Sequence, residues 1–281
     1  MTLAKTLDLL SAARAAGAAV AAFNVIGLEH AEAIVAGAER AGSPVILQLS
    51  ENTVAYHCGR IEPVGRACAA LAEAASVPVA LHLDHATTRD LATRALAVGF
   101  TSAMIDTSDL PIAEHTRLTA GHAAWAHDNG AALEAALGVV GGKDGQTSTD
   151  DGRTDPDAAR AFVAATGVDT LAVAVGTSHH MARQTARIDL ALIARLRAAV
   201  HLPLVLHGAS GVPDDDLREA VRRGITKVNL ATQLNAAFTA ALRACLAAHP
   251  DEVDPRPALS AAREAVSATV ADRITLLAGA S

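Results

Sequence analysis

The chain has 281 residues, a length that suits one α/β barrel, a fold that commonly needs about 250 residues. Hydrophobic residues make up 51% of the chain and charged residues 19%, which excludes a disordered protein. A net charge of −7 and an aromatic content of 2% argue against a nucleic-acid binder, which needs basic surface and, for single strands, stacking rings. We therefore expect no nucleic-acid partner.

Eight short apolar runs alternate with helix-like stretches along the whole chain. The runs are continuous rather than alternating, which is typical of parallel strands buried on both faces. We predict strands at residues 19–25, 44–50, 77–85, 102–106, 131–137, 170–175, 202–208 and 225–230.

The segments between the strands carry helix start and stop signals. Thr88 suits the cap of a helix running toward Gly99, and Pro213 suits the first position of a helix that ends near Gly224. Eight such units predict a (β/α)8 TIM barrel, the α/β fold class with one closed sheet. The alternative is an open doubly wound sheet, which would want a glycine-rich turn after its first strand, and residues 24–27 lack one.

The C-terminal region and one internal segment do not belong to this repeat. From about residue 233 the chain is helical and rich in alanine, with a break at 249–257. Residues 141–156 are rich in Gly, Asp, Ser and Thr, which predicts a long loop that is either functional or disordered. We therefore expect a single barrel domain over 1–281 with extra C-terminal helices.

The location of the protein is suggested by its cysteines and by its N-terminal residues. Cys58, Cys68 and Cys245 are an odd number without a CxxC motif, which predicts a reducing, cytoplasmic compartment. Charges interrupt the apolar N-terminal stretch, so we predict no signal peptide. No run of about 18 apolar residues occurs, so we predict no membrane span.

Nearly every predicted strand ends in a polar side chain. Barrel enzymes carry their chemistry at these carboxyl ends, so the pattern predicts a polar active site. The residues are Asn24, Gln48, Ser50, Asp84, His85, Asp106, Ser108, Glu134, His179, His207 and Asn229.

Three of these residues, His85, His179 and His207, could converge from strands 3, 6 and 7 to form a catalytic zinc site. The alternative is that each is a separate buried or surface histidine. Asp84 precedes His85, and strict alternation would place the two on opposite faces unless the strand ends there. A helix-capping or loop role is the alternative for Asp84.

Two turns suit a phosphate group. Residues 207–211 follow strand 7 and residues 229–232 follow strand 8, and amide groups at helix starts bind anions without basic side chains. Ordinary turn chemistry is the alternative, because Gly and Ser are common in turns. Lys227 is the sole lysine on a predicted strand, which weakens a mechanism through a lysine imine.

Eight motifs lie in order along the chain, at 23–25, 48–50, 81–85, 102–108, 168–179, 204–211, 225–232 and 254–256. Together they resemble the class II, zinc-dependent ketose-bisphosphate aldolases, and most of all the tagatose- and fructose-bisphosphate aldolases. The resemblance spans about 5 to 270. It implies a lyase of carbohydrate metabolism, as in glycolysis, that cleaves a ketose 1,6-bisphosphate into dihydroxyacetone phosphate and an aldehyde phosphate. Breaking this bond leaves an enediolate, which zinc stabilises in place of an imine.

The resemblance also implies roles for single residues. Asp84 would be the proton donor or acceptor, and Asp144 would take part from the mobile loop. Zn²⁺ would be held by His85, His179 and His207, with Asp106 supporting the metal region and Glu134 near an alternate metal position. The sugar phosphate, with a nearby Na⁺ or K⁺, would meet Asn24, Ser50, His180, Gly208, Ala209, Ser210, Asn229, Leu230, Ala231 and Thr232. A homodimer or homotetramer is expected.

The departures from the family pattern lie around the substrate. Ala136 replaces the second glutamate of an E-x-E pair, and Asp144 stands where a longer glutamate is usual. His180 replaces a glycine, a following tyrosine is missing, and Asp109 replaces a histidine. Three alternatives therefore remain: an aldolase for another phosphorylated or modified ketose, a non-catalytic sugar-phosphate or metal binder, and a zinc hydrolase, which would want HxH on strand 1.

Overall fold

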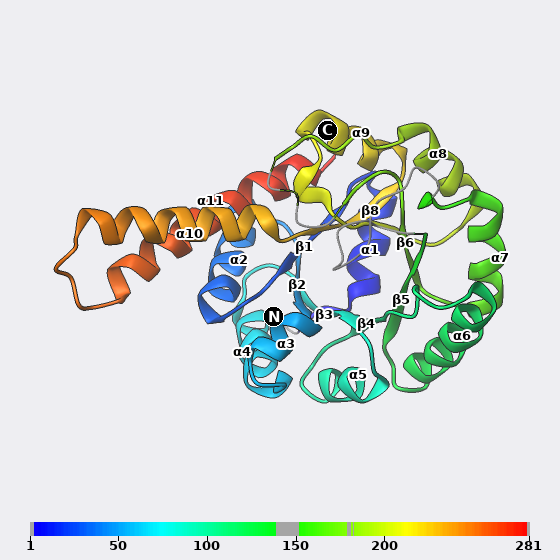
Figure 1. Ribbon diagram of the computed structural model, residues 1–281, viewed down its shortest axis with the longest axis horizontal. Helices are drawn as coiled ribbons and strands as arrows, with labels where there is room; N and C mark the ends of the chain where they lie inside the picture. Colours follow the sequence, from blue (N-terminus) through cyan, green and yellow to red (C-terminus); the bar gives the residue numbers. More distant parts are fainter. Residues whose placement is uncertain (1–2, 139–151, 179–180, 182, 280–281) are drawn as a thin grey trace.

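The structure is a computed structural model that describes residues 3–138, 152–178, 181 and 183–279. Eight parallel strands pair in sequence order, and β1 pairs with β8, so the sheet closes into a barrel (Figure 1). This confirms the TIM barrel and excludes the open sheet. The strands are β1 (Val20–Asn24), β2 (Val45–Ser50), β3 (Val79–Ala86), β4 (Ser102–Ile105), β5 (Ala132–Leu137), β6 (Thr170–Val173), β7 (Leu204–Leu206) and β8 (Ile225–Leu230).

Helices surround the barrel on its outer side (Figure 1). Those that flank the strands pack the apolar faces of their amphipathic sequences on the outward side chains of the strands. The described part of the chain has eleven α-helices. They are α1 (Thr6–Ala15), α2 (Leu28–Ala41), α3 (Glu51–Tyr56), α4 (Ile61–Ala74), α5 (Arg89–Leu96), α6 (Ile112–Asp128), α7 (Pro156–Thr166), α8 (Leu190–Ala199), α9 (Asp214–Arg223), α10 (Thr232–Ala248) and α11 (Arg256–Leu277).

The helix start and stop residues that we predicted lie at or next to the observed helix ends. The Thr88 hydroxyl accepts a hydrogen bond from Leu91 N at 3.3 Å, so Thr88 caps α5 as predicted. Pro213 stands one residue before α9 rather than inside it, and α9 ends at Arg223 before Gly224. Most of the predicted loop 141–156 lies outside the described residues.

The inside of the barrel changes character from one end to the other. Leu9 and Leu10 of α1 pack against the inward side chains Val20, Ile46 and Ala80, which closes the amino-terminal end of the barrel with apolar groups. Farther along, the inward positions become polar. Among the described residues, the buried polar groups therefore lie toward the carboxyl ends of the strands, away from this apolar end.

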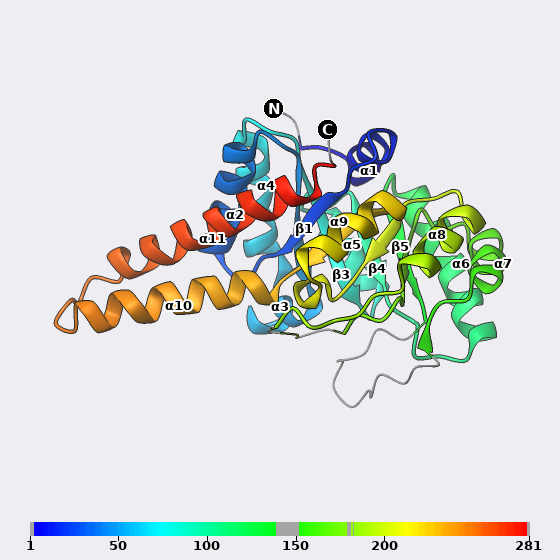
Figure 2. The same cartoon turned by 90° about the horizontal axis from the view of Figure 1, so that it is seen from above.

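Helices α10 and α11 form an arm that extends away from the barrel (Figure 2). Only Leu234 of α10 is buried, whereas α11 packs along α2 over its C-terminal half and buries residues such as Val266, Val270 and Ile274. The sequence break that we predicted at 249–257 is the turn between these two helices. Within the described part of the chain, no helix is long and apolar enough to cross a membrane.

Candidate active site

The end of β3 brings two neighbouring residues into one pocket. His85 has a φ of +51°, and the pairing of β3 with β4 shifts register between Leu83 and Ala86. We expected Asp84 and His85 to share a pocket only if the strand ended there. The strand instead continues to Ala86, and the left-handed backbone at His85 breaks the alternation of side chains.

Asp106 fixes the orientation of the His85 ring. The Nδ1 atom of His85 lies 2.8 Å from Asp106 Oδ2, so this nitrogen carries the proton and donates it. Asp106 Oδ1 accepts hydrogen bonds from the Ser108 amide and hydroxyl, which holds the carboxylate in place. The unprotonated Nε2 atom of His85 is then left to act as a ligand.

His207 is oriented by a different carboxylate and presents the opposite nitrogen. Its Nε2 atom donates to Glu134 Oε1 at 2.9 Å, while its Nδ1 atom lies 3.2 Å from His85 Nε2. Two ligands of a tetrahedral zinc ion, at about 2.0–2.1 Å from the metal, stand about 3.4 Å apart. The donor set therefore fits a metal, and Asp84 offers a third ligand atom within 4.8 Å of the other two.

Asp84 is a buried carboxylate beside this pair of rings. Burial alone would raise its pKa, but the facing His85, His207 and Lys227 outweigh it and hold the pKa below its ordinary value. Asp84 Oδ1 has no hydrogen-bond partner among the described residues and lies 3.9 Å from His85 Nε2. An ionised oxygen without a partner is ready to accept a proton from a bound hydroxyl group.

Lys227 occupies the layer beneath these residues. It is fully buried on β8, and its Nζ atom lies 2.7 Å from Glu134 Oε2. In that layer His82 also lies 3.8 Å from Glu134 Oε2, and burial lowers the pKa of His82 to about 3, so its ring is neutral. An amine held in a buried ion pair is a poor nucleophile, so the structure supports our argument against an imine mechanism.

Lys227 and His82 were not among the predicted site residues. A signal was present, because residues two apart on a strand share a face. Lys227 is two residues from Asn229, and His82 is two residues from Asp84. Both pairs point into the barrel, where the Asn229 amide nitrogen lies 3.2 Å from His207 Nε2.

The remaining candidate residues lie around the rim of this cluster. The Asn24 side chain accepts a hydrogen bond from Gln48 Nε2 at 3.2 Å, and the Ser50 hydroxyl caps α3 by accepting from Thr53 N. Gln233 of α10 donates to the Ser210 carbonyl at 3.1 Å, which joins the turns after β7 and β8. The candidates His179, His180 and Asp144 lie outside the described residues.

Gly208 permits a close approach between two of the strand-end turns. Its φ is +67°, and a side chain there would place Cβ 2.6 Å from the Ser178 carbonyl oxygen. Only glycine fits this conformation without strain. The turn after β7, with Ala209 and Ser210, can therefore lie directly against the turn after β6.

Comparison with known proteins identifies the family to which the chain belongs. Residues 4–281 match the family model for class II fructose-bisphosphate aldolases, so the chain belongs to this family. It is 32% identical to the YdjI aldolase from Escherichia coli K12, with a TM-score of 0.85 and coverage of 98% of this chain and 97% of that one. A protein from Coccidioides immitis is 30% identical, with a TM-score of 0.85 and coverage of 97% and 96%.

A more distant structure shares the fold. The fructose-bisphosphate aldolase from Campylobacter jejuni is 22% identical, with a TM-score of 0.81, and the match covers 98% of this chain and 95% of that one. The family supports a lyase that acts as an aldolase on a ketose phosphate. Class II aldolases are typically metal-dependent, and the side chains described above could hold a metal ion.

Proposed function

We propose that the protein is a zinc-dependent aldolase that cleaves a ketose 1,6-bisphosphate of the fructose or tagatose type into dihydroxyacetone phosphate and an aldehyde phosphate. One observation carries this most strongly. His85 Nε2 and His207 Nδ1 face each other at 3.2 Å beside the buried Asp84 carboxylate. His85 and His207, with His179, would hold the ion, which supplies Lewis-acid polarisation of the substrate keto group.

Side chains of the protein would transfer the proton and hold the metal ligands in position. In the cleavage direction Asp84 takes the proton from the hydroxyl group beta to the ketone, and in the condensation direction it returns that proton. Its lowered pKa favours the ionised form that cleavage needs. Asp106 holds the His85 ring in place while the carbon–carbon bond breaks.

The turns after β7 and β8 suit one phosphate of the substrate. Helix α10 has no side-chain cap and no acidic residue in its first turn, so the amide groups near Ala231 and Thr232 favour an anion. In contrast, the first turn of α9 carries Asp214, Asp215 and Asp216. The turn at Gly208 lies beside α10 through the bond between Gln233 and Ser210.

Turnover before and after metal removal tests the proposal. We expect release of dihydroxyacetone phosphate from fructose or tagatose bisphosphate, loss of this activity after treatment with EDTA, and recovery on addition of Zn²⁺. A coupled enzyme assay measures the product, and elemental analysis measures the metal. Bound zinc without cleavage of either sugar would contradict the substrate assignment, and a panel of other ketose phosphates would then separate an altered aldolase from a non-catalytic binder.

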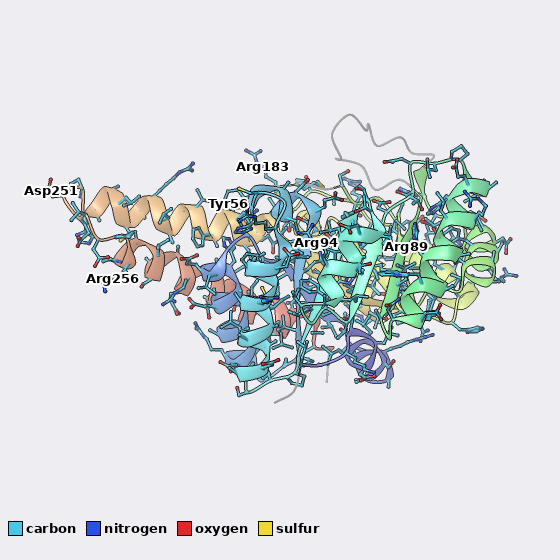
Figure 3. The ribbon with its side chains drawn as sticks, turned by 90° about the horizontal axis from the view of Figure 1, so that it is seen from below. Tyr56, Arg89, Arg94, Arg183, Asp251 and Arg256 are labelled. Carbon is cyan, nitrogen blue, oxygen red and sulfur yellow. The ribbon has the colours of Figure 1, made fainter. Side chains whose placement is uncertain are left out.

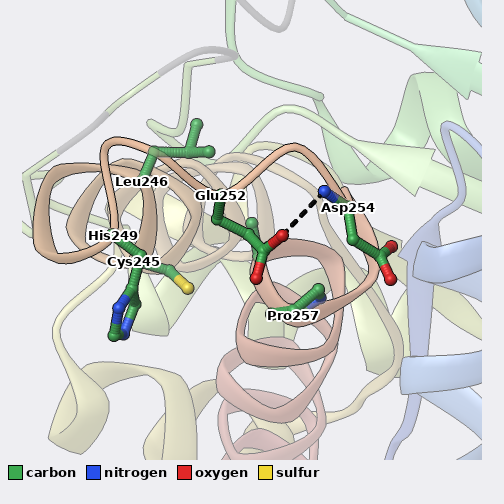
Figure 4. Close-up of a pocket in the computed structure, with 7 residues that line it drawn as sticks. Cys245, Leu246, His249, Glu252, Asp254 and Pro257 are labelled. Atoms are coloured by element: carbon green, nitrogen blue, oxygen red, sulfur yellow. Dashed lines mark hydrogen bonds between the residues drawn. The ribbon is translucent and has the colours of Figure 1, made fainter.

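We propose that a second copy of the chain covers part of the arm, consistent with the dimer or tetramer that the family resemblance implies. Helix α10 has 17 residues but one buried side chain, and Arg243 is its only charged residue. Asp251 and Arg256 lie at the tip of the arm, far from the barrel (Figure 3). A small hollow there is lined by Cys245, Leu246, His249, Glu252, Asp254, Pro257 and Ala258 (Figure 4).

An exposed alanine on α10 offers a test of this interface. Ala240→Glu changes helix propensity little, but it would place a charge in a covered apolar surface. We expect the variant to shift toward monomers in light scattering after gel filtration. Ala70→Glu on the exposed side of α4 is the matched control and should keep the mass of the unmodified protein. Equal masses for all three proteins would contradict the proposal.

A further inference from the structure

Three buried side chains form a continuous line from the inside of the barrel to the candidate metal. Lys227 Nζ lies 2.7 Å from Glu134 Oε2, Glu134 Oε1 lies 2.9 Å from His207 Nε2, and His207 Nδ1 faces His85. All three side chains are at most 2% exposed. Lys227 lies on β8, Glu134 lies on β5 and His207 directly follows β7, so the barrel itself sets their spacing.

A neutral imidazole can carry its proton on either nitrogen, and only the other nitrogen can bind a metal. The Glu134 carboxylate can only accept, so its 2.9 Å contact requires the proton of His207 to be on Nε2. The Asn229 amide nitrogen, at 3.2 Å from the same atom, would favour the other tautomer, but it is farther away and uncharged. In His85 the two nitrogens are reversed: Nδ1 carries the proton and donates it to Asp106, so Nε2 is the nitrogen that can bind a metal. Each ring therefore needs its own carboxylate to present the nitrogen that faces the other ring.

Glu134 cannot reorient easily, because both of its oxygens are engaged. Oε1 accepts from His207, while Oε2 accepts from Lys227 and also from the Thr170 hydroxyl at 3.4 Å. Burial alone would raise the pKa of Glu134, but the charge of Lys227 holds it well below the ordinary value. The family resemblance implies that Glu134 lies near an alternate metal position, and Glu134 does lie in a cluster with His82 and Asp84 that could hold an ion. Its contacts with His207 and Lys227 point to a second role.

We propose that Glu134, held by Lys227, is a positioning residue that selects the Nε2–H tautomer of His207 and so presents Nδ1 to the metal. The inference rests on the proposed function only in requiring a divalent ion at His85 and His207. Lys227 acts one step farther away, because it neutralises and orients the carboxylate. Lys227 thereby supports the metal ligand His207 through Glu134.

Two double variants separate the hydrogen bond from the buried charges. Changing one member of the ion pair would leave a buried charge without a partner, so both must be neutralised together. Glu134→Gln with Lys227→Met keeps a carbonyl oxygen that can accept from His207 Nε2. Glu134→Leu with Lys227→Met removes this acceptor while keeping a side chain of similar size.

The readouts are the tautomer of His207 in the metal-free protein, from ¹⁵N NMR of the imidazole nitrogens, and the Kd for Zn²⁺ by competition with a chelator. We expect the Gln variant to keep the Nε2–H tautomer, with a Kd within about tenfold of the unmodified protein. We expect the Leu variant to populate both tautomers and to bind zinc about 10–100-fold more weakly.

Ser102→Ala provides the control for loss of a buried polar contact. Ser102 bonds to His82 and Thr6 but not to His207, so this variant should lose stability and keep its zinc affinity. The proposal is wrong if the Leu variant keeps the Nε2–H tautomer, or if the two double variants lose zinc affinity equally. A protein that binds zinc without cleaving a sugar would refute the proposed function and leave these results unchanged.

Discussion

Asp84→Ala is expected to lower the cleavage rate by a factor on the order of 10² or more, while the protein still binds zinc. The carboxylate is buried, ionised and next to the proposed metal, but its Oδ1 atom lies 3.9 Å from His85 Nε2 and does not hold that ring. Asp106 and Glu134 orient the two histidines without it. Steady-state kinetics and elemental analysis of the same preparation measure both properties.

The isosteric variant Asp84→Asn distinguishes proton transfer from packing. Asparagine fills the same volume but cannot take the proton of a hydroxyl group at neutral pH. If Asp84 moves the proton, both variants are inactive and both retain metal. Normal cleavage by either variant would show that another group is the base.

His207→Ala is expected to weaken zinc binding by more than about 100-fold, because even partners of metal-binding histidines are typically worth 10–100-fold in affinity. His85 alone would remain of the two described rings that face each other. The ion pair of Glu134 and Lys227 is retained, so we expect the barrel to fold. Isothermal titration with zinc and circular dichroism check affinity and fold.

His30→Leu is the matched control for removal of a buried histidine. His30 lies on α2 and stacks on Phe238 of α10 at 4.5 Å, outside the metal cluster. This variant should bind zinc as tightly as the unmodified protein. Zinc binding that survives His207→Ala would contradict the assignment of His207 as a ligand.

The agreement between sequence and structure is greatest where a local pattern suffices. Eight continuous apolar runs predicted eight buried strands, and the closed barrel confirms them. The end of β6 was predicted two residues too late, because Ala174 and Val175 continue the apolar pattern past Val173. The end of β7 was predicted at 208, whereas the strand ends at Leu206. Positive φ at Gly176 and Gly208 turns the chain soon after each strand.

The amino-acid sequence by itself determined the barrel, the polar strand ends and the resemblance to metal-dependent aldolases. Only the tertiary structure decided how Asp84 and His85 share a pocket, because the backbone at His85 is left-handed. Only the tertiary structure shows that Lys227 pairs with Glu134, and that Glu134 and Asp106 accept hydrogen bonds from His207 and His85. These contacts join strands far apart in the chain, and their geometry depends on the closure and stagger of the whole barrel, which no local pattern of residues records.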